Sequence, residues 1–183
     1  HDAKTTDPVK PTVRDLVEYA GFRLMLGTLM VLPEPVSRWL GSVCGWFAGS
    51  VAGVRRSVVR ENLEIAFPDL DPADRRRIAR RSWAHLGREV VATFRLSGET
   101  RESVLSRIEG WDGFDEFAAR VREGGGTIAV TGHFGNWEMA GAVVACRGYH
   151  MDAVATTQRN PLFNRDLVES RARLGLAIVP RDE

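Results

Sequence analysis

The sequence predicts an α/β protein in which a mostly parallel sheet is flanked by helices and preceded by N-terminal membrane-associated helices. From about residue 103 onward, short apolar runs typical of strands alternate with helical patterns over short connections. Such alternation is typical of parallel strands joined by crossover helices. Before this region lie two adjacent apolar segments, residues 16–32 and 36–54, which lack the strand pattern.

Composition places the chain among ordinary folded proteins. With 183 residues, 44% hydrophobic and 27% charged, it has the size and balance of one domain with a sizeable core. The net charge is +1, so there is no global electrostatic bias towards nucleic acid, and we expect no nucleic-acid partner. Cys44 and Cys146 have no metal-type spacing, so free thiols in a reducing compartment and no metal site are expected. Residues 1–13 are expected to be a disordered tail.

The two apolar segments predict contact with a bilayer surface. Both contain charged residues, so neither is the run of about 20 uncharged residues that spans a membrane. Trp39 and Trp46 lie in the second segment among glycines and apolar residues, which fits helices lying in a bilayer interface. We therefore expect residues 14–54 to be membrane-associated helices. The alternative is a buried helical hairpin in a soluble core.

Two further helices are predicted in the middle of the chain. The first runs from about residue 55 to Pro68, which ends it. Asp71 and Pro72 then have the residue types of an N-cap and a first helical position, and the helix they open extends to about Leu96. The arginines of this helix predict a solvated basic face, with anionic lipid headgroups as a secondary partner. These arginines are Arg75, Arg76, Arg77, Arg80 and Arg81.

The second half of the chain supplies the sheet. Its predicted elements are a helix over 114–122, a strand over 127–131, a helix over 136–147, a strand over 151–156, a helix over 162–174 and a strand over 176–179. The chain ends soon after the last strand. Because three strands make a thin sheet, we expect that the chain is truncated at its C-terminus and that part of the sheet and site lies beyond it.

Residues 127–138 are the most informative for function. An apolar run ends at Gly132 and His133, and a turn then leads into a helical pattern that carries Glu138. Five residues apart on one helix, two side chains differ by about 140° and cannot meet. His133 must therefore precede the helix, with Gly135 permitting the turn and Asn136 as the N-cap. Glu138 can then polarise one ring nitrogen of His133, while the other accepts a proton from a hydroxyl.

Other interpretations of this pair remain open. As metal ligands, His133 and Glu138 lack a further histidine or cysteine nearby. A purely structural contact between a histidine and a glutamate is common. The sequence has no Gly-x-Ser-x-Gly elbow and no phosphate-binding loop signature, which argues against those two classes of enzyme.

Three separated motifs carry a resemblance to a known family. Residues 131–141, Thr-Gly-His-Phe-Gly-Asn-Trp-Glu-Met-Ala-Gly, resemble the His-x4-Glu/Asp motif of the bacterial lipid A late acyltransferases, within the lysophospholipid acyltransferase superfamily. Residues 60–68 resemble the arginine–asparagine–leucine and phenylalanine–proline pattern of that family. Residues 159–175 resemble its second block. The resemblance covers about residues 14–183.

The resemblance implies transfer of a fatty acyl chain from an acyl carrier protein or coenzyme A thioester to a lipid hydroxyl in lipid A biosynthesis. It implies a location on the cytoplasmic face of the inner membrane, no cofactor besides the thioester co-substrate, and residues 55–183 as an incomplete acyltransferase domain. His133 matches the catalytic base, Glu138 the acid that polarises it, and Arg171 an arginine that supports the site. The residues implied on the substrate side are Gly135, Asn136, Arg159 and Asn164.

Alternative functions follow from the same observations. The arginine-rich composition also suits a phosphatidylinositol mannoside acyltransferase, or another lysolipid acyltransferase. A non-catalytic membrane-binding module would use the apolar N-terminus and the basic helix, with a structural pair of His133 and Glu138. A thioesterase or hydrolase would use water as the acceptor, although no serine or cysteine nucleophile lies beside His133.

Overall fold

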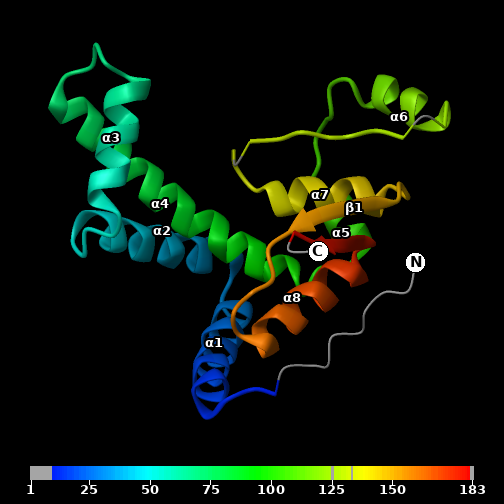
Figure 1. Ribbon diagram of the computed structural model, residues 1–183, viewed down its shortest axis with the longest axis horizontal. Coiled ribbons are helices and arrows are strands. Elements are labelled where there is room, and N and C mark those ends of the chain that lie inside the picture. The colour runs from blue at the N-terminus through cyan, green and yellow to red at the C-terminus, as the bar shows by residue number, and fades with distance from the viewer. Residues whose placement is uncertain (1–9, 125, 133, 182–183) are drawn as a thin grey trace. The chain divides into compact units, whose positions relative to one another are not determined.

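A computed structural model describes residues 10–124, 126–132 and 134–181, and these are mostly helical (Figure 1). The described residues divide into two compact units. One, here called the helical unit, comprises residues 21–95. The other, here called the sheet unit, comprises residues 10–20 together with 96–181. Residues 1–9 of the predicted tail lie outside the described residues, and Val13, also predicted as tail, is the first residue of a helix. The predicted division into a tail, membrane-associated helices and an acyltransferase domain stays a prediction.

The helical unit contains the predicted helices of the first half of the chain. They are the later part of α1 (Val13–Val31), then α2 (Glu34–Ser50), α3 (Arg56–Ala66) and α4 (Pro72–Leu96). Asp71 caps α4 as predicted, because its Oδ1 accepts hydrogen bonds from the backbone N–H groups of Ala73 and Asp74 at 2.7 and 2.9 Å. These backbone hydrogen bonds lower the pKa of the Asp71 carboxyl, since they favour its charged form.

One face of α2 packs directly on the backbone of α4. Gly41, Gly45 and Gly49 recur every four residues and therefore lie on one face of α2. A Cβ atom added to Gly45 would lie 2.1 Å from the carbonyl oxygen of Trp83, and one added to Gly87 would lie 2.1 Å from that of Gly41. The two helices thus approach as closely as only glycine allows.

A different face of α2 is apolar and exposed. Trp39 is 63% exposed and Phe47 54% exposed, and Val36, Val43 and Trp46 are also exposed. This face is uncovered among the described residues, and the choice between membrane contact and a buried hairpin stays a prediction. Across the described part of the chain, no helix has both the length and the apolar character needed to cross a membrane.

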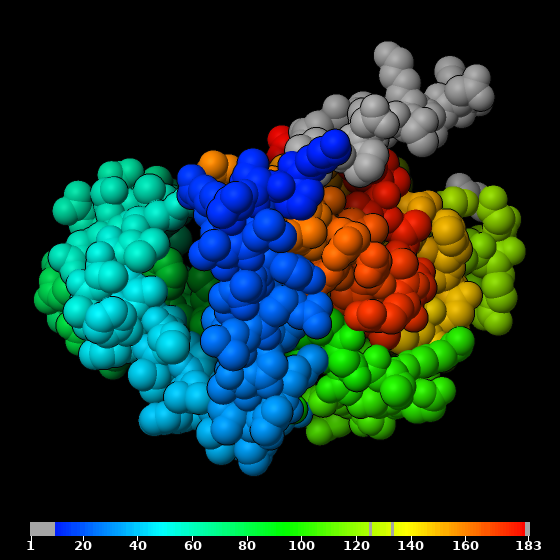
Figure 2. All heavy atoms as spheres, turned by 90° about the horizontal axis from the view of Figure 1, so that it is seen from below, coloured from blue at the N-terminus to red at the C-terminus, as the bar shows by residue number. Residues whose placement is uncertain are grey.

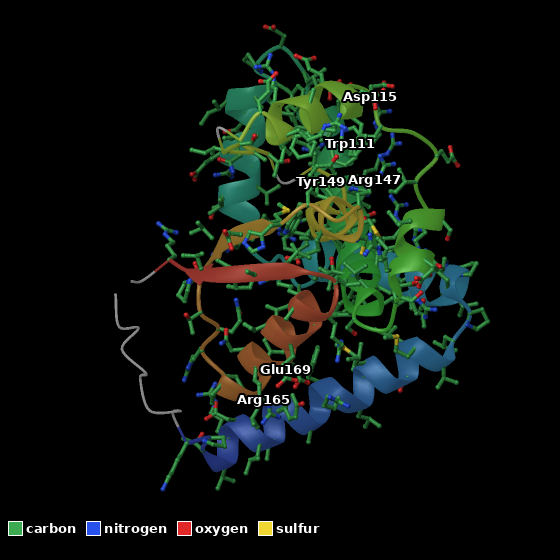
Figure 3. The ribbon with its side chains drawn as sticks, turned by 90° about the vertical axis from the view of Figure 1, so that its right-hand side faces the viewer. Trp111, Asp115, Arg147, Tyr149, Arg165 and Glu169 are labelled. Carbon is green, nitrogen blue, oxygen red and sulfur yellow. The ribbon has the colours of Figure 1, made fainter. Side chains whose placement is uncertain are left out.

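The sheet unit is built around two parallel strands, β1 (Met151–Ala155) and β2 (Leu176–Pro180), paired in register from Met151 with Leu176 to Ala155 with Pro180. Helix α7 (Trp137–Cys146) lies on one side of the strands and α8 (Pro161–Arg173) on the other (Figures 1 and 3). Figure 2 shows the outer surface of α8. The core consists of Leu96, Val104, Ala142, Val143, Ala145, Cys146, Leu174 and Leu176. The predicted parallel pairing and the flanking helices are confirmed for these two strands.

The predicted strand over residues 127–131 is wrong. This segment has no strand assignment, and both Ile128 and Val130 are 92% exposed. A strand needs a neighbour to satisfy its backbone hydrogen bonds, and the described sheet consists of β1 and β2 alone. The apolar run therefore has the composition of a strand without a described partner.

A short helix that was not predicted, α5 (Arg101–Ser106), is capped by the Thr100 side chain, which accepts a hydrogen bond from the Ser103 N–H.

An aromatic cluster holds α6 (Phe114–Arg122) to the residues that follow α7. The rings of Phe114 and Phe117 lie 5.8 and 5.4 Å from that of Tyr149, centroid to centroid. The guanidinium of Arg147 lies 4.1 Å from the ring centroid of Phe114 and 5.5 Å from that of Trp111. Figure 3 shows Trp111, Arg147 and Tyr149 gathered at this place. Cation–π and edge contacts of this kind stabilise the attachment of α6.

Replacing Gly87 by alanine tests the close contact between α2 and α4. Its Cβ would collide with backbone atoms, which cannot move independently, so Gly87→Ala should lower the free energy of unfolding by about 1–3 kcal/mol. The matched control is Gly27→Ala in α1, where an added Cβ meets no atom within 4 Å. It should raise stability by about 0.5–1 kcal/mol, because alanine favours helix over glycine. Urea unfolding measures the change in the free energy of unfolding for both variants. Equal changes in Gly87→Ala and Gly27→Ala would contradict the close packing of α2 on α4.

Candidate functional site

The turn before α7 is formed as the sequence predicts. Gly135 has a φ of 57°, in the left-handed region that favours glycine. The side chain of Asn136 caps α7 by accepting a hydrogen bond from the Met139 N–H at 3.0 Å. His133 lies outside the described residues, so its role as the base stays a prediction. The predicted roles of Gly135 and Asn136 toward the substrate also stay predictions.

Glu138 and Arg171 form a bidentate ion pair between α7 and α8. The Arg171 Nε donates to one carboxylate oxygen of Glu138 at 2.9 Å, and Nη2 donates to the other. The side chains are 15% and 17% exposed, so the pair is largely shielded from water. Two parallel charge-assisted hydrogen bonds fix both the distance and the orientation of the carboxylate. Two residues implied by the resemblance are thus brought together.

This arrangement leaves the Glu138 carboxylate able to do further chemistry. Each carboxylate oxygen has two lone pairs, and Arg171 occupies one on each. The remaining lone pairs can accept a hydrogen bond from an imidazole N–H. Because Glu138 lies in the first turn of α7, the backbone N–H groups at that helix start are also close in sequence to the carboxylate.

The loop before α8 is held by asparagines. Asn160 caps α8 by accepting from the Leu162 N–H at 3.1 Å, and its Nδ2 donates to the Asp15 carbonyl at 3.0 Å. Asn164 accepts from the Gln158 N–H at 2.9 Å, so its side chain supports this loop. Sequence reasoning missed Asn160, although asparagine directly before a proline is a helix-start signal. The predicted substrate contact of Asn164 stays a prediction.

The other cations near α8 have different surroundings. Arg159 is exposed, and its charge adds to the hydrogen bonds from Thr12 that lower the pKa of Asp15. Arg173 is exposed and donates to the Ser97 carbonyl at 3.1 Å. In the described ranges, no three side chains of His, Cys, Asp or Glu are grouped so as to hold a metal ion. Arg159 is thus exposed, as are Arg165 and Arg173 of the same block, whereas Arg171 is largely shielded.

Comparison with known proteins identifies the family. The family model described as bacterial lipid A biosynthesis acyltransferase matches residues 9–183. The chain belongs to this family. It is 28% identical over 155 residues to a lipid A biosynthesis palmitoleoyltransferase of Escherichia coli (strain K12), covering 82% of this chain and 49% of that protein. It is 25% identical over 151 residues to a lipid A biosynthesis acyltransferase of Haemophilus influenzae, and this match covers 80% of this chain and 46% of that protein.

The match confirms the resemblance seen in the three motifs. A lipid A biosynthesis acyltransferase of Shigella flexneri is also 28% identical over 155 residues. The chain spans about half the length of these curated relatives. The matched region includes the turn before α7, the ion pair of Glu138 and Arg171, and the loop before α8.

A double-mutant cycle measures how strongly the ion pair couples α7 to α8. Glu138→Gln, Arg171→Gln and the double variant should give a coupling of about 1–3 kcal/mol in urea unfolding, because two charge-assisted hydrogen bonds are shielded from water. The control pair is Arg165 and Glu169, which lie 3.8 Å apart on the exposed surface of α8 (Figure 3). Its coupling should be only about 0.3–0.5 kcal/mol. Equal couplings would show that the shielded pair has no special stability.

Proposed function

We propose that the protein transfers a fatty acyl chain from an acyl carrier protein or coenzyme A thioester to a lipid hydroxyl in lipid A biosynthesis. The observation that supports this most is the fixed carboxylate of Glu138, held by Arg171 and placed five residues after His133 in a chain of this family. A carboxylate held in one orientation is what a catalytic histidine needs as a partner.

The proposed reaction needs no covalent acyl-enzyme. His133 takes the proton of the acceptor hydroxyl as the hydroxyl oxygen attacks the thioester carbonyl carbon. The tetrahedral intermediate then breaks its carbon–sulfur bond, and the thiolate leaves with the proton from the imidazolium. Glu138 accepts a hydrogen bond from the second ring nitrogen and stabilises the imidazolium, and Arg171 positions Glu138. The thioester is the only co-substrate in this proposal.

The residues around the turn fit the substrate side of this reaction. Gly135 and Asn136 shape the start of α7, whose first backbone N–H groups can stabilise a developing oxyanion. Arg159 is exposed and can contact a phosphate of the acceptor, and Asn164 supports the loop that carries it. We therefore assign all four to the binding of substrate.

Membrane association fits the exposed face of α2. Tryptophans are favoured at the boundary between lipid and water, and Trp39 and Trp46 are both exposed there. We propose that this face lies in the cytoplasmic surface of the inner membrane, where an acyl thioester and a lipid acceptor meet. A phosphatidylinositol mannoside or other lysolipid would be an alternative acceptor with the same chemistry.

Acyl transfer by the protein in detergent tests this proposal. Labelled acyl carrier protein and coenzyme A thioesters would be offered with a panel of lipid A precursors, phosphatidylinositol mannosides and lysophospholipids. His133→Ala and Glu138→Ala should each lower kcat by about 10²–10⁴-fold, because the general base or its partner is removed.

Circular dichroism of each variant would show that folding is retained. Glu169→Ala, on the exposed surface of α8, is the control and should leave turnover unchanged. Normal turnover in either His133→Ala or Glu138→Ala would overturn the mechanism. Retained lipid binding without any acyl transfer would favour the binding module, and release of free fatty acid would favour a hydrolase.

A further inference from the structure

A cavity of about 420 Å³ lies within the helical unit, between α3 and α4. One face of α3 and one face of α4 supply most of its lining, and the end of α2 completes it. This is within the size range of small-ligand sites. The residues of α3 at the cavity are Arg56, Val59, Arg60, Leu63 and Glu64, and those of α4 are Pro72, Arg75, Arg76, Ala79, Arg80 and Trp83.

The cavity lining carries a strong positive charge. Five arginines line the cavity against a single carboxylate, Glu64, which lies 3.8 Å from Arg60. Arg75 donates to the backbone carbonyl of Phe67 at 3.2 Å, and its charge also contributes to lowering the pKa of the nearby Asp71 carboxyl. Within the described residues, Arg76 and Arg80 make no direct ion pair or hydrogen bond, although the charge of Arg76 contributes to lowering the pKa of the nearby Asp71 carboxyl. Their charges are therefore available to an anion in the cavity.

Part of the cavity lining is apolar. Val59, Leu63 and Trp83 are each half-buried there. A Cβ atom added to Gly49 would lie 2.1 Å from the Trp83 ring, so the indole is packed against the α2 backbone. The hydroxyl oxygen of Ser50, which also lines the cavity, is buried and has no hydrogen-bond partner within the described residues. An acceptor on a ligand would satisfy this group.

We propose that this cavity binds an anionic phospholipid of the membrane. Arg76 and Arg80 hold the phosphate, since guanidinium groups pair well with phosphate oxygens. The glycerol and the first methylenes of the acyl chains contact the apolar lining residues Leu63 and Trp83. The site lies entirely within residues 21–95 and uses none of the residues assigned to acyl transfer.

Two observations favour a lipid over an acidic protein as the occupant. The cavity lining combines five arginines with apolar side chains, whereas an acidic protein surface would need only exposed charge. The cavity also adjoins the last residues of α2, Gly49 and Ser50, and this helix carries the exposed apolar face with Trp46 and Phe47. A bilayer in contact with that face would present its headgroups to the same end of α2.

Isothermal titration calorimetry with short-chain lipids tests the proposal independently of catalysis. Dihexanoylphosphatidic acid below its micelle concentration should bind with saturation. Inorganic phosphate and dihexanoylphosphatidylcholine should bind at least about tenfold more weakly, because phosphate lacks the acyl chains and phosphatidylcholine lacks the net charge. The double variant Arg76→Gln/Arg80→Gln should weaken binding of the phosphatidic acid by about tenfold or more.

The matched control removes the same number of charges from the same helix. Arg77→Gln/Arg81→Gln changes two arginines that do not line the cavity and should leave binding unchanged. Equal weakening by both double variants would overturn the proposal and indicate non-specific attraction. Equal affinity for inorganic phosphate and the lipid would also overturn it, as would tighter binding of a polyglutamate peptide. A further variant, Leu63→Gln, should weaken lipid binding while leaving phosphate binding unchanged.

Discussion

The ion pair between Glu138 and Arg171 is the contact on which the candidate site depends. It joins the helices that lie on either side of the two strands, and it fixes the carboxylate in the first turn of α7. Without Arg171, a largely buried carboxylate would lose its compensating charge and its orientation. Arg171 therefore serves both the packing of the sheet unit and the proposed chemistry, through a single guanidinium.

Helix α2 shows how one short segment meets two different physical demands. Its glycines at every fourth position allow its backbone to contact α4, and its aromatic residues occupy a separate, exposed face. The exposed face costs free energy in water, because large apolar side chains remain hydrated. Contact with a lipid surface would remove that cost, and α2 ends at the arginine-lined cavity, where lipid headgroups can be held.

Local signals predicted local structure well. The N-caps Asp71 and Asn136 and the turn at Gly135 are where short-range patterns place them, since the hydrogen bonds involved span only two or three residues. Non-local features could not be predicted in this way. The strand expected over residues 127–131 depends on a partner strand that its own composition cannot reveal.

The same limit applies to the candidate site. The contact between Glu138 and Arg171 joins residues 33 apart in the chain, and only the resemblance indicated Arg171. Likewise, the basic face of α4 was interpreted as solvated, because nothing in its own sequence shows that α3 turns arginines toward the same cavity. Helices and strands pair through the packing of their apolar faces. A periodic pattern in the sequence shows that an element has an apolar face, but it does not show which other element covers that face.

The most direct measurement of the central claim compares the acyl-transfer kinetics of Arg171→Lys with those of Arg173→Lys. Lysine keeps the charge but cannot make two parallel hydrogen bonds to one carboxylate. We predict that Arg171→Lys lowers kcat by about tenfold with an unchanged acceptor KM, because Glu138 is misplaced and substrate binding is not affected. Arg173→Lys, two residues along the same helix, should retain normal kcat. A normal kcat in Arg171→Lys would contradict the account.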